Sequence, residues 1–336
     1  MTVRWEDLDA RARGLATHLL GPIELAALAQ SPDLSAVGDA LRRDGYPVAE
    51  GERSPEALEL AVRRMAAARL GVLARWSGSR TAALSILFED EDRRSLRAVL
   101  RGAVQGVPAE ERLAGLVPTS SLPEGALREL ARQDRPGAVA SLLVAWGNPY
   151  GPALLPVASA DHPDLFTLEL RLNAAFAARA TRAARGTGLL EACVREMIDI
   201  ENAYAALVLA SEGEDVTAGD TFLAGGERVS LEVFQFAAAA ASLPEAARRL
   251  ARAFSGSPLE PLFERYAGDP GELEDAVLRQ RIRQLVQATR TEPLGPAPLL
   301  AYVLRVRAEV VDLRRIIWGV ALGTPPALLA SELVTA

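Results

Sequence analysis

The sequence predicts an all-α protein built from three similar helical bundles. Hydrophobic residues make up 49% of the 336 residues and are dominated by alanine and leucine, which favour helix, whereas aromatic residues make up only 5%. The alternation of apolar and polar residues that is typical of strands is nearly absent. Similar patterns also recur at intervals of slightly more than a hundred residues, which indicates repeated units.

Helix starts are well marked. Ser54 precedes Pro55 and Asp269 precedes Pro270, so a capping side chain stands directly before a proline that suits the first turn of a helix. Residues 161–164 read D-H-P-D and form a looser version of the same signal. We therefore expect a helix to begin at each of these three places.

The strongest helical pattern lies near the C-terminal end. Apolar residues recur there at spacings of three and four, which is the stripe of a helix that packs on other helices. They are Val303, Val306, Val310, Leu313 and Ile317. Arg305 and Glu309 lie four residues apart on the side expected to be polar, where they are expected to pair weakly.

One pattern occurs twice at long range. Residues 97–108 and 314–325 both read R-x-x-x-x-G-x-x-x-G-x-P, at a separation of 217 residues. At this separation Asp92 corresponds to Glu309, and a copy between them places Asp199 at the same position. A period of this kind is typical of repeated units of one design.

A second landmark agrees with this register. The turn signal G-x-P begins at Gly45, Gly147 and Gly256, and each copy precedes one of the three acidic positions by a similar distance. We draw the unit boundaries near Pro118 and Gly226. The predicted helical units are residues 1–118, 119–226 and 227–336.

Charge and hydropathy exclude several classes of partner. A net charge of −7 argues against nucleic acid and against anionic lipid, because binding to either relies on neutralising phosphates. The start of the chain lacks the apolar run of a signal peptide, and no segment reaches the roughly 20 apolar residues that span a bilayer. We therefore expect no direct membrane insertion. One cysteine, Cys193, excludes an internal disulfide and suits a reducing cytosol.

The sequence predicts no catalytic, cofactor-binding or metal-binding residues. The two histidines, His18 and His162, lie in different predicted units. The spacings of zinc sites, serine nucleophile elbows and phosphate-binding loops are absent from the sequence.

One acidic cluster, residues 89–92, reads E-D-E-D and suggests an alternative. Carboxylates on a helix can hold Mg²⁺, so a Mg²⁺-dependent all-α enzyme is one interpretation. The favoured interpretation is a solvated helix start in which carboxylates pair with arginines four residues later. The expected pairs are Glu89 with Arg93 and Asp90 with Arg94.

Six segments carry a resemblance to a known family. They are residues 8–13, 199–204, 221–228, 292–295, 300–302 and 309–314. Together they resemble the family of C subunits of V-type and A-type ATPases, whose eukaryotic counterpart is the d subunit. Trp5 and Asp9 stand where that family usually has Tyr and Asn. Its members consist of three homologous helical units around a pseudo-threefold axis, so the resemblance implies this arrangement here.

The resemblance also implies a function. It implies a non-catalytic central-stalk subunit of a rotary ATPase, without cofactors, whose partners are the central-shaft subunits and the membrane ring of proteolipid subunits. Such a spacer turns with both partners during proton or sodium transport coupled to ATP synthesis or hydrolysis. It would be cytoplasmic and held at the inner face of the membrane through the complex. The alternative is a free-standing α-helical scaffold with unrelated partners.

Seven polar residues near the corresponding acidic positions are the candidate site residues. They are Asp92, Asp199, Glu201, Asn202, Glu309, Asp312 and Arg314. One interpretation is a rim that meets a partner. The favoured interpretation is a polar network that ties helices together at the axis of the units, because buried polar groups must find partners.

Overall fold

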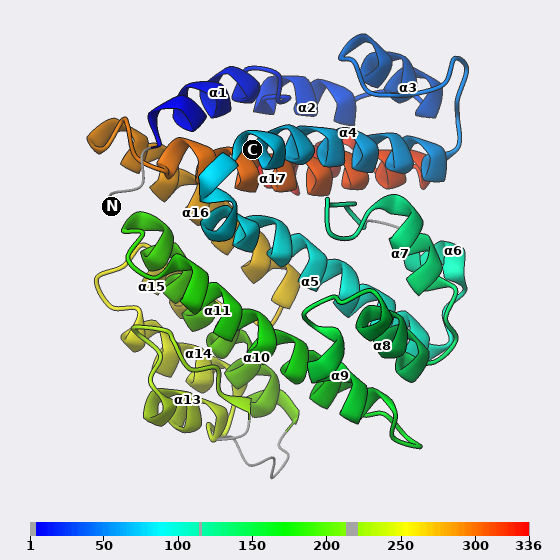
Figure 1. Ribbon diagram of the computed structural model, residues 1–336. Coiled ribbons are helices and arrows are strands. Elements are labelled where there is room, and N and C mark those ends of the chain that lie inside the picture. The colour runs from blue at the N-terminus through cyan, green and yellow to red at the C-terminus, as the bar shows by residue number, and fades with distance from the viewer. Residues whose placement is uncertain (1–4, 114–115, 213–220, 336) are drawn as a thin grey trace. The chain divides into compact units, whose positions relative to one another are not determined.

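The computed structural model describes residues 5–113, 116–212 and 221–335 of the chain. All regular secondary structure within these ranges is helical, which confirms the predicted all-α class (Figure 1).

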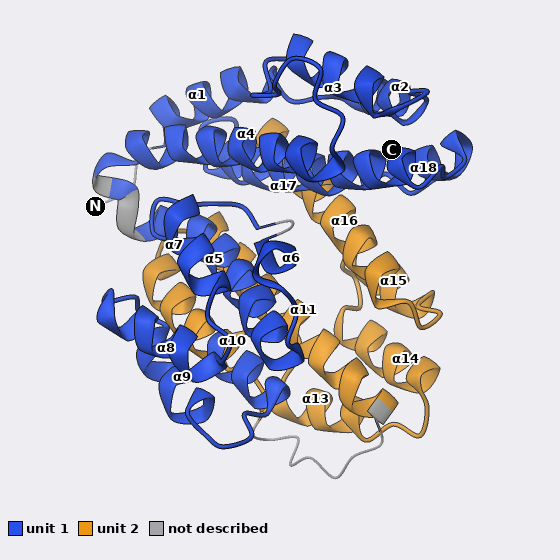
Figure 2. Cartoon of the chain, turned by 90° about the vertical axis from the view of Figure 1, so that its right-hand side faces the viewer, with its two compact units in different colours: residues 1–172, 292–336 blue, residues 173–291 orange. Residues whose placement is uncertain are grey.

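The chain divides into two compact units (Figure 2). Unit 1 comprises residues 1–172 and 292–336, and unit 2 comprises residues 173–291. These units are defined by packing, whereas the boundaries near Pro118 and Gly226 were drawn from sequence likeness. The division into three repeated units therefore stays a prediction.

The helices of the N-terminal part of unit 1 are α1 (Glu6–Ala16), α2 (Pro22–Ala29), α3 (Leu34–Arg43), α4 (Pro55–Trp76), the 3-10 helix η1 (Gly78–Arg80), α5 (Thr81–Gln105), α6 (Ala109–Leu113), α7 (Glu124–Ala131), α8 (Pro136–Ala145) and α9 (Gly151–Ala158). Its C-terminal part adds α17 (Ala297–Ala321) and α18 (Pro326–Ser331). The helices of unit 2 are α11 (Leu189–Glu212), α13 (Leu231–Ala238), α14 (Leu243–Ala253), α15 (Glu260–Glu264) and α16 (Pro270–Thr291). α10 (Leu165–Ala184) begins in unit 1 and ends in unit 2.

The predicted helix starts are confirmed. α4 begins at Pro55, and the Ser54 hydroxyl oxygen accepts the N–H of Ala57 at 3.2 Å. α16 begins at Pro270, and α10 begins directly after residues 161–164. The three G-x-P signals follow the ends of α3, α8 and α14.

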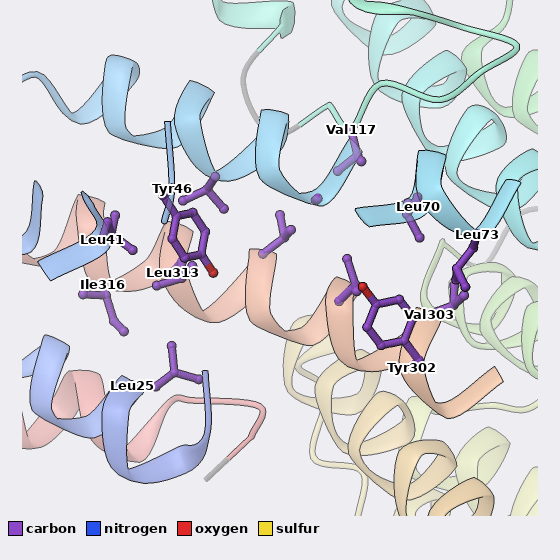
Figure 3. Close-up of a cluster of buried hydrophobic side chains, with 14 of the residues drawn as sticks. Leu25, Leu41, Tyr46, Leu70, Leu73, Val117, Tyr302, Val303, Leu313 and Ile316 are labelled. Carbon is purple, nitrogen blue, oxygen red and sulfur yellow. The ribbon is translucent and has the colours of Figure 1, made fainter. Parts of the chain in front are cut away.

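α17 is the central helix of unit 1, and it packs against α1, α2, α3 and α4. The five apolar residues of its predicted stripe all belong to the core of this unit, which confirms the predicted packing face. Figure 3 shows its side chains lying among those of the helices around it. The labelled neighbours are Leu25 of α2, Leu41 of α3, Leu70 and Leu73 of α4, and also Tyr46 and Val117.

The R-x-x-x-x-G-x-x-x-G-x-P pattern forms the same helix ending twice. Its second glycine, Gly106 after α5 and Gly323 after α17, has a φ of 68° and 70° respectively. This left-handed conformation favours glycine, because a Cβ is strained there. The next N–H donates to the carbonyl of the first glycine, at 2.9 Å for Gly102 and 2.8 Å for Gly319.

The first glycine of the pattern allows the following helix to approach closely. A Cβ on Gly102 would overlap the side chain of Arg112 in α6, and a Cβ on Gly319 would overlap that of Leu329 in α18. Both copies of the pattern thus end a long helix and fold a short helix back onto it.

Unit 2 is organised around α11, which packs against α13 and α14. Two pairs of aromatic rings also pack in this unit. Phe254 and Phe263 stack with ring centroids 4.8 Å apart, and Phe222 and Phe234 meet at 5.7 Å.

Candidate functional site

The candidate residues lie on three long helices. Asp92 is on α5; Asp199, Glu201 and Asn202 are on α11; Glu309, Asp312 and Arg314 are on α17. Five of the seven are buried; Glu201 is half-buried and Arg314 is exposed.

Asp92 holds the connector between α6 and α7 in unit 1. It is 1% exposed and accepts hydrogen bonds from the hydroxyls of Thr119 and Ser121. Burial raises the pKa of Asp92 to about 6, and these two hydrogen bonds oppose the rise. The connector is therefore fastened to α5 through side-chain hydroxyls.

Asp199 shapes the segment before α13 in unit 2. Its carboxylate accepts the backbone N–H groups of Glu227 and Arg228 at 3.0 Å and of Val229 at 2.9 Å. The chain passes so close that a Cβ on Gly226 would overlap this carboxylate. Backbone donors thus surround a fully buried carboxyl group, which satisfies its need for hydrogen-bond partners.

Asn202 and Asp312 each fasten the chain that follows their long helix. Asn202 donates to the carbonyl of Leu223 at 2.9 Å and accepts its N–H at 2.8 Å. Asp312 accepts the N–H groups of Val334 at 2.6 Å and Thr335 at 3.0 Å, and the Thr335 hydroxyl at 2.7 Å. Burial raises the pKa of Asp312, and these hydrogen bonds oppose the rise.

Glu309 does not lie on the polar side of its helix, so the expected weak pairing with Arg305 was wrong. It is 2% exposed and forms an ion pair with Arg69 of α4. Its other carboxylate oxygen accepts the N–H of Leu20 at 2.7 Å. Burial raises the pKa of Glu309, and the Arg69 guanidinium opposes this rise.

Arg69 lies at the centre of this network, but it was not among the candidate residues selected from the sequence. It donates to the carbonyl of His18 at 2.7 Å and lies 5.3 Å from the ring centroid of Tyr46. The available signal was its spacing, because Ala66, Arg69 and Leu73 follow one another at three and four residues on the buried face of α4.

Arg314 is exposed and forms an ion pair with Glu59. Its side chain is 50% exposed, and its Nε lies 3.4 Å from a carboxylate oxygen of Glu59 on α4. The other oxygen of Glu59 accepts the indole N–H of Trp318 at 2.6 Å. Arg314 and Trp318 together fasten α17 to α4 at a second point.

The acidic cluster 89–92 lies inside α5 and Asp92 is buried, so the expectation of a solvated helix start was wrong. The pairing of Asp90 with Arg94 is confirmed at 3.2 Å, and Asp90 also pairs with Arg93 at 2.8 Å. Burial favours a high pKa for Asp90, but the guanidinium groups of Arg94, Arg93 and Arg307 outweigh it and lower that pKa. Glu89 accepts the hydroxyl of Tyr150 at 2.9 Å.

These residues form hydrogen bonds and ion pairs that join helices to each other and to the segments that follow them. Buried carboxylates and an amide meet backbone N–H groups, hydroxyls and a guanidinium. Across the parts of the chain that the structure describes, no group of three or more His, Cys, Asp or Glu residues is placed to hold a metal ion.

Comparison with known proteins gives a consistent result. The family model of the ATP synthase (C/AC39) subunit matches residues 8–331. The C subunit of the V-type ATP synthase from each of two Thermus thermophilus strains is 30% identical over 310 residues, which cover 90% of this chain and 90% of the relative. The C subunit of the A-type ATP synthase of Halorubrum lacusprofundi is 25% identical over 288 residues, covering 82% of this chain and 81% of the relative.

Proposed function

The chain belongs to the ATP synthase (C/AC39) subunit family, and we propose that it is a non-catalytic central-stalk subunit of a rotary V/A-type ATPase. In this role it is a spacer between the central-shaft subunits and the membrane ring of proteolipid subunits. It transmits rotation between them while ions cross the membrane and ATP is made or hydrolysed.

The observation that carries this proposal is the extent of the likeness. The similarity to the C subunit of the Thermus thermophilus V-type ATP synthase covers 90% of both chains, so it includes unit 1 and unit 2 alike. A partial match would support a shared fold for one unit, whereas a match over both supports a shared role for the whole chain.

The internal ties of the molecule support a mechanical role. A spacer that bears torque needs stiff helices whose ends do not fray, and dense packing resists deformation. In unit 1, α17 is fastened to α4 at Glu309 and at Arg314 and to its own following chain at Asp312. In unit 2, Asp199 and Asn202 fasten the chain after α11.

We propose that other subunits of the complex hold the chain at the membrane. In the described ranges, the structure contains no helix that is long and apolar enough to cross a bilayer. We therefore assign attachment to the proteolipid ring and the shaft, at the cytoplasmic face of the membrane.

A pull-down from the native membrane tests the proposal. The chromosomal copy is tagged, the membranes are dissolved in a mild detergent, and the eluate is assayed for ATPase activity and analysed by mass spectrometry. We expect ATPase activity, proteolipid subunits and about one tagged chain per complex.

Two results would contradict the proposal. Recovery of the tagged chain in soluble complexes with other proteins would favour the free-standing scaffold. Recovery of an active ATPase with several tagged chains per complex would exclude a single spacer on the rotation axis.

A further inference from the structure

The tie between Asp92 and the α6–α7 connector differs in kind from the tie at Asp199. Both hydrogen-bond donors of Asp92 are hydroxyls, those of Thr119 and Ser121, which lie 3.1 Å apart. Asp199 instead receives three backbone N–H groups. Backbone N–H groups only donate, whereas a hydroxyl both donates and accepts. A protonated Asp92 can therefore keep both contacts by donating to one hydroxyl.

The acidic groups beside Asp92 favour its protonated form, whereas Arg93 and Arg94 of the same helix pair with Asp90. Glu89 and Glu91 lie on the same helix and add negative charge beside it. From the other elements, Thr119 and Ser121 of the connector donate their hydroxyls to Asp92, and Tyr150 donates its hydroxyl to Glu89. Arg307 of α17 acts on Asp90 and Glu91. Ionisation of Asp92 therefore places a negative charge in a buried position among like charges.

Two hydrogen bonds close residues 119–122 of the connector on themselves. The hydroxyl oxygen of Thr119 accepts the N–H of Leu122 at 3.1 Å, and the N–H of Thr119 donates to the carbonyl of Leu122 at 3.1 Å. These bonds close residues 119–122 into a compact turn whose attachment to α5 includes the Asp92 carboxyl group. We call this turn and Asp92 the connector latch.

We propose that the connector latch is pH-responsive: the turn stays closed on α5 while Asp92 is protonated and opens more readily once Asp92 is ionised. Opening exposes the carboxylate to water and relieves the cost of its burial. The latch would thus couple the pH around the protein to the attachment of the α6–α7 region. The proposal does not depend on the role in the rotary complex.

The sign and size of the effect follow from linkage. Burial raises the pKa of Asp92 from 3.8 to about 6 in the closed latch. Between these two pKa values, the closed latch holds a proton that the open latch has released. Opening therefore increases as pH rises from the pKa of the open latch to that of the closed latch. If opening restores the ordinary pKa, the open population rises about tenfold between pH 5.0 and pH 7.5.

Amide hydrogen exchange on the purified full chain tests the latch. The reporters are the amides of Thr119 and Leu122, whose rates are corrected for the intrinsic effect of pH. The internal reference is the amide of Leu223, which donates to the side-chain oxygen of Asn202, a group that does not titrate. We expect protection of the reporters to fall about tenfold from pH 5.0 to pH 7.5 relative to the reference.

The variant Asp92→Asn separates titration of Asp92 from other effects of pH. It keeps the shape of the side chain and removes its charge, so the reporters should stay protected at both pH values. Ser121→Ala is the second variant, and it removes a donor to the ionised form. It should shift the transition to higher pH.

The proposal is overturned if reporter protection in the wild type changes by less than about twofold relative to the reference. It is overturned equally if Asp92→Asn retains the tenfold change. If Asp92→Asn does not fold, Ser121→Ala decides instead. The proposal is then overturned if the pH transition of Ser121→Ala is not shifted from that of the wild type.

Discussion

Glu309 of α17 and Arg69 of α4 form a buried ion pair between residues that lie 240 positions apart in the chain. The pair also reaches the turn between α1 and α2, because Arg69 donates to the carbonyl of His18 and Glu309 accepts the N–H of Leu20. One ion pair thus joins three separate segments of unit 1. Its side chains are 8% and 3% exposed, so solvent screens them little.

Removal of Arg69 should be strongly destabilising. Arg69→Met leaves the carboxylate of Glu309 buried without its cation, and we expect a loss of about 3–5 kcal/mol in the free energy of unfolding. Urea unfolding followed by circular dichroism measures this. The matched control is Arg42→Met, because Arg42 pairs with Asp39 on the surface, where both side chains are well exposed. That change should cost less than about 1 kcal/mol. Equal losses would contradict a special role for the buried pair.

Gly226→Ala should destabilise unit 2. The added Cβ overlaps the carboxylate of Asp199, so the chain must shift away from its hydrogen bonds, at a cost of roughly 1–3 kcal/mol. Gly14→Ala serves as the control, since Gly14 lies in α1 with no atom within 4 Å of its added Cβ. It should be neutral or stabilising by up to ~1 kcal/mol. Thermal unfolding compares the two, and a harmless Gly226→Ala would disprove the close approach.

A double-mutant cycle tests the packing of α18 on the end of α17. Gly319→Ala should cost roughly 1–3 kcal/mol, because its Cβ overlaps the side chain of Leu329, which is 6% exposed. Leu329→Ala alone should cost about 2–5 kcal/mol through the cavity that it leaves. In the double variant the new methyl group occupies part of that cavity, so the losses should be less than additive. Strict additivity would argue against contact between the two residues.

The thiol of Cys193 should react slowly. Burial raises its pKa from 9.0 to about 11, with Glu196 adding to the rise and Arg281 opposing it. Because the thiolate is the nucleophile, alkylation by iodoacetamide at pH 8 should be about a hundredfold slower than for an ordinary thiol, and it should accelerate as pH rises. Mass spectrometry follows the single cysteine, with the chain in concentrated urea as the control. A folded rate close to the unfolded rate would refute this.

The proposed attachment to the proteolipid ring should depend on ionic strength. One asymmetric chain cannot make identical specific pairs with a ring of identical subunits, so we expect a contact that is spread out and carried by charge. Raising the salt concentration shortens the range of such interactions and should release the chain from purified complexes. Co-sedimentation with the ring at increasing salt measures the release. Binding that is insensitive to salt would favour a compact apolar contact instead.

Much of the fold could be predicted because its signals are local. The cap at Ser54 and the proline after it marked the start of α4, and the spacing of Val303, Val306 and Val310 marked the buried face of α17. The repeated glycine pattern ended α5 and α17 in the same way, since a left-handed residue and a close helix approach both require glycine. Membership of the family was also readable from the sequence, and the match over residues 8–331 confirms it.

The partners of the buried charges could not be predicted in this way. Glu309 follows Val306 and precedes Leu313 at the spacing of the apolar stripe, yet a glutamate is expected to face water unless a partner compensates its burial. That partner is Arg69, which only the packing of α4 on α17 brings near. The same holds for Asp92, whose hydroxyl donors lie beyond the end of its own helix. The sequence by itself therefore determined the all-α class, the starts of α4, α10 and α16, the buried apolar face of α17 and the family. Only the tertiary structure decided which acidic side chains are buried, because the cost of burying a charge is offset by donors that lie far along the chain.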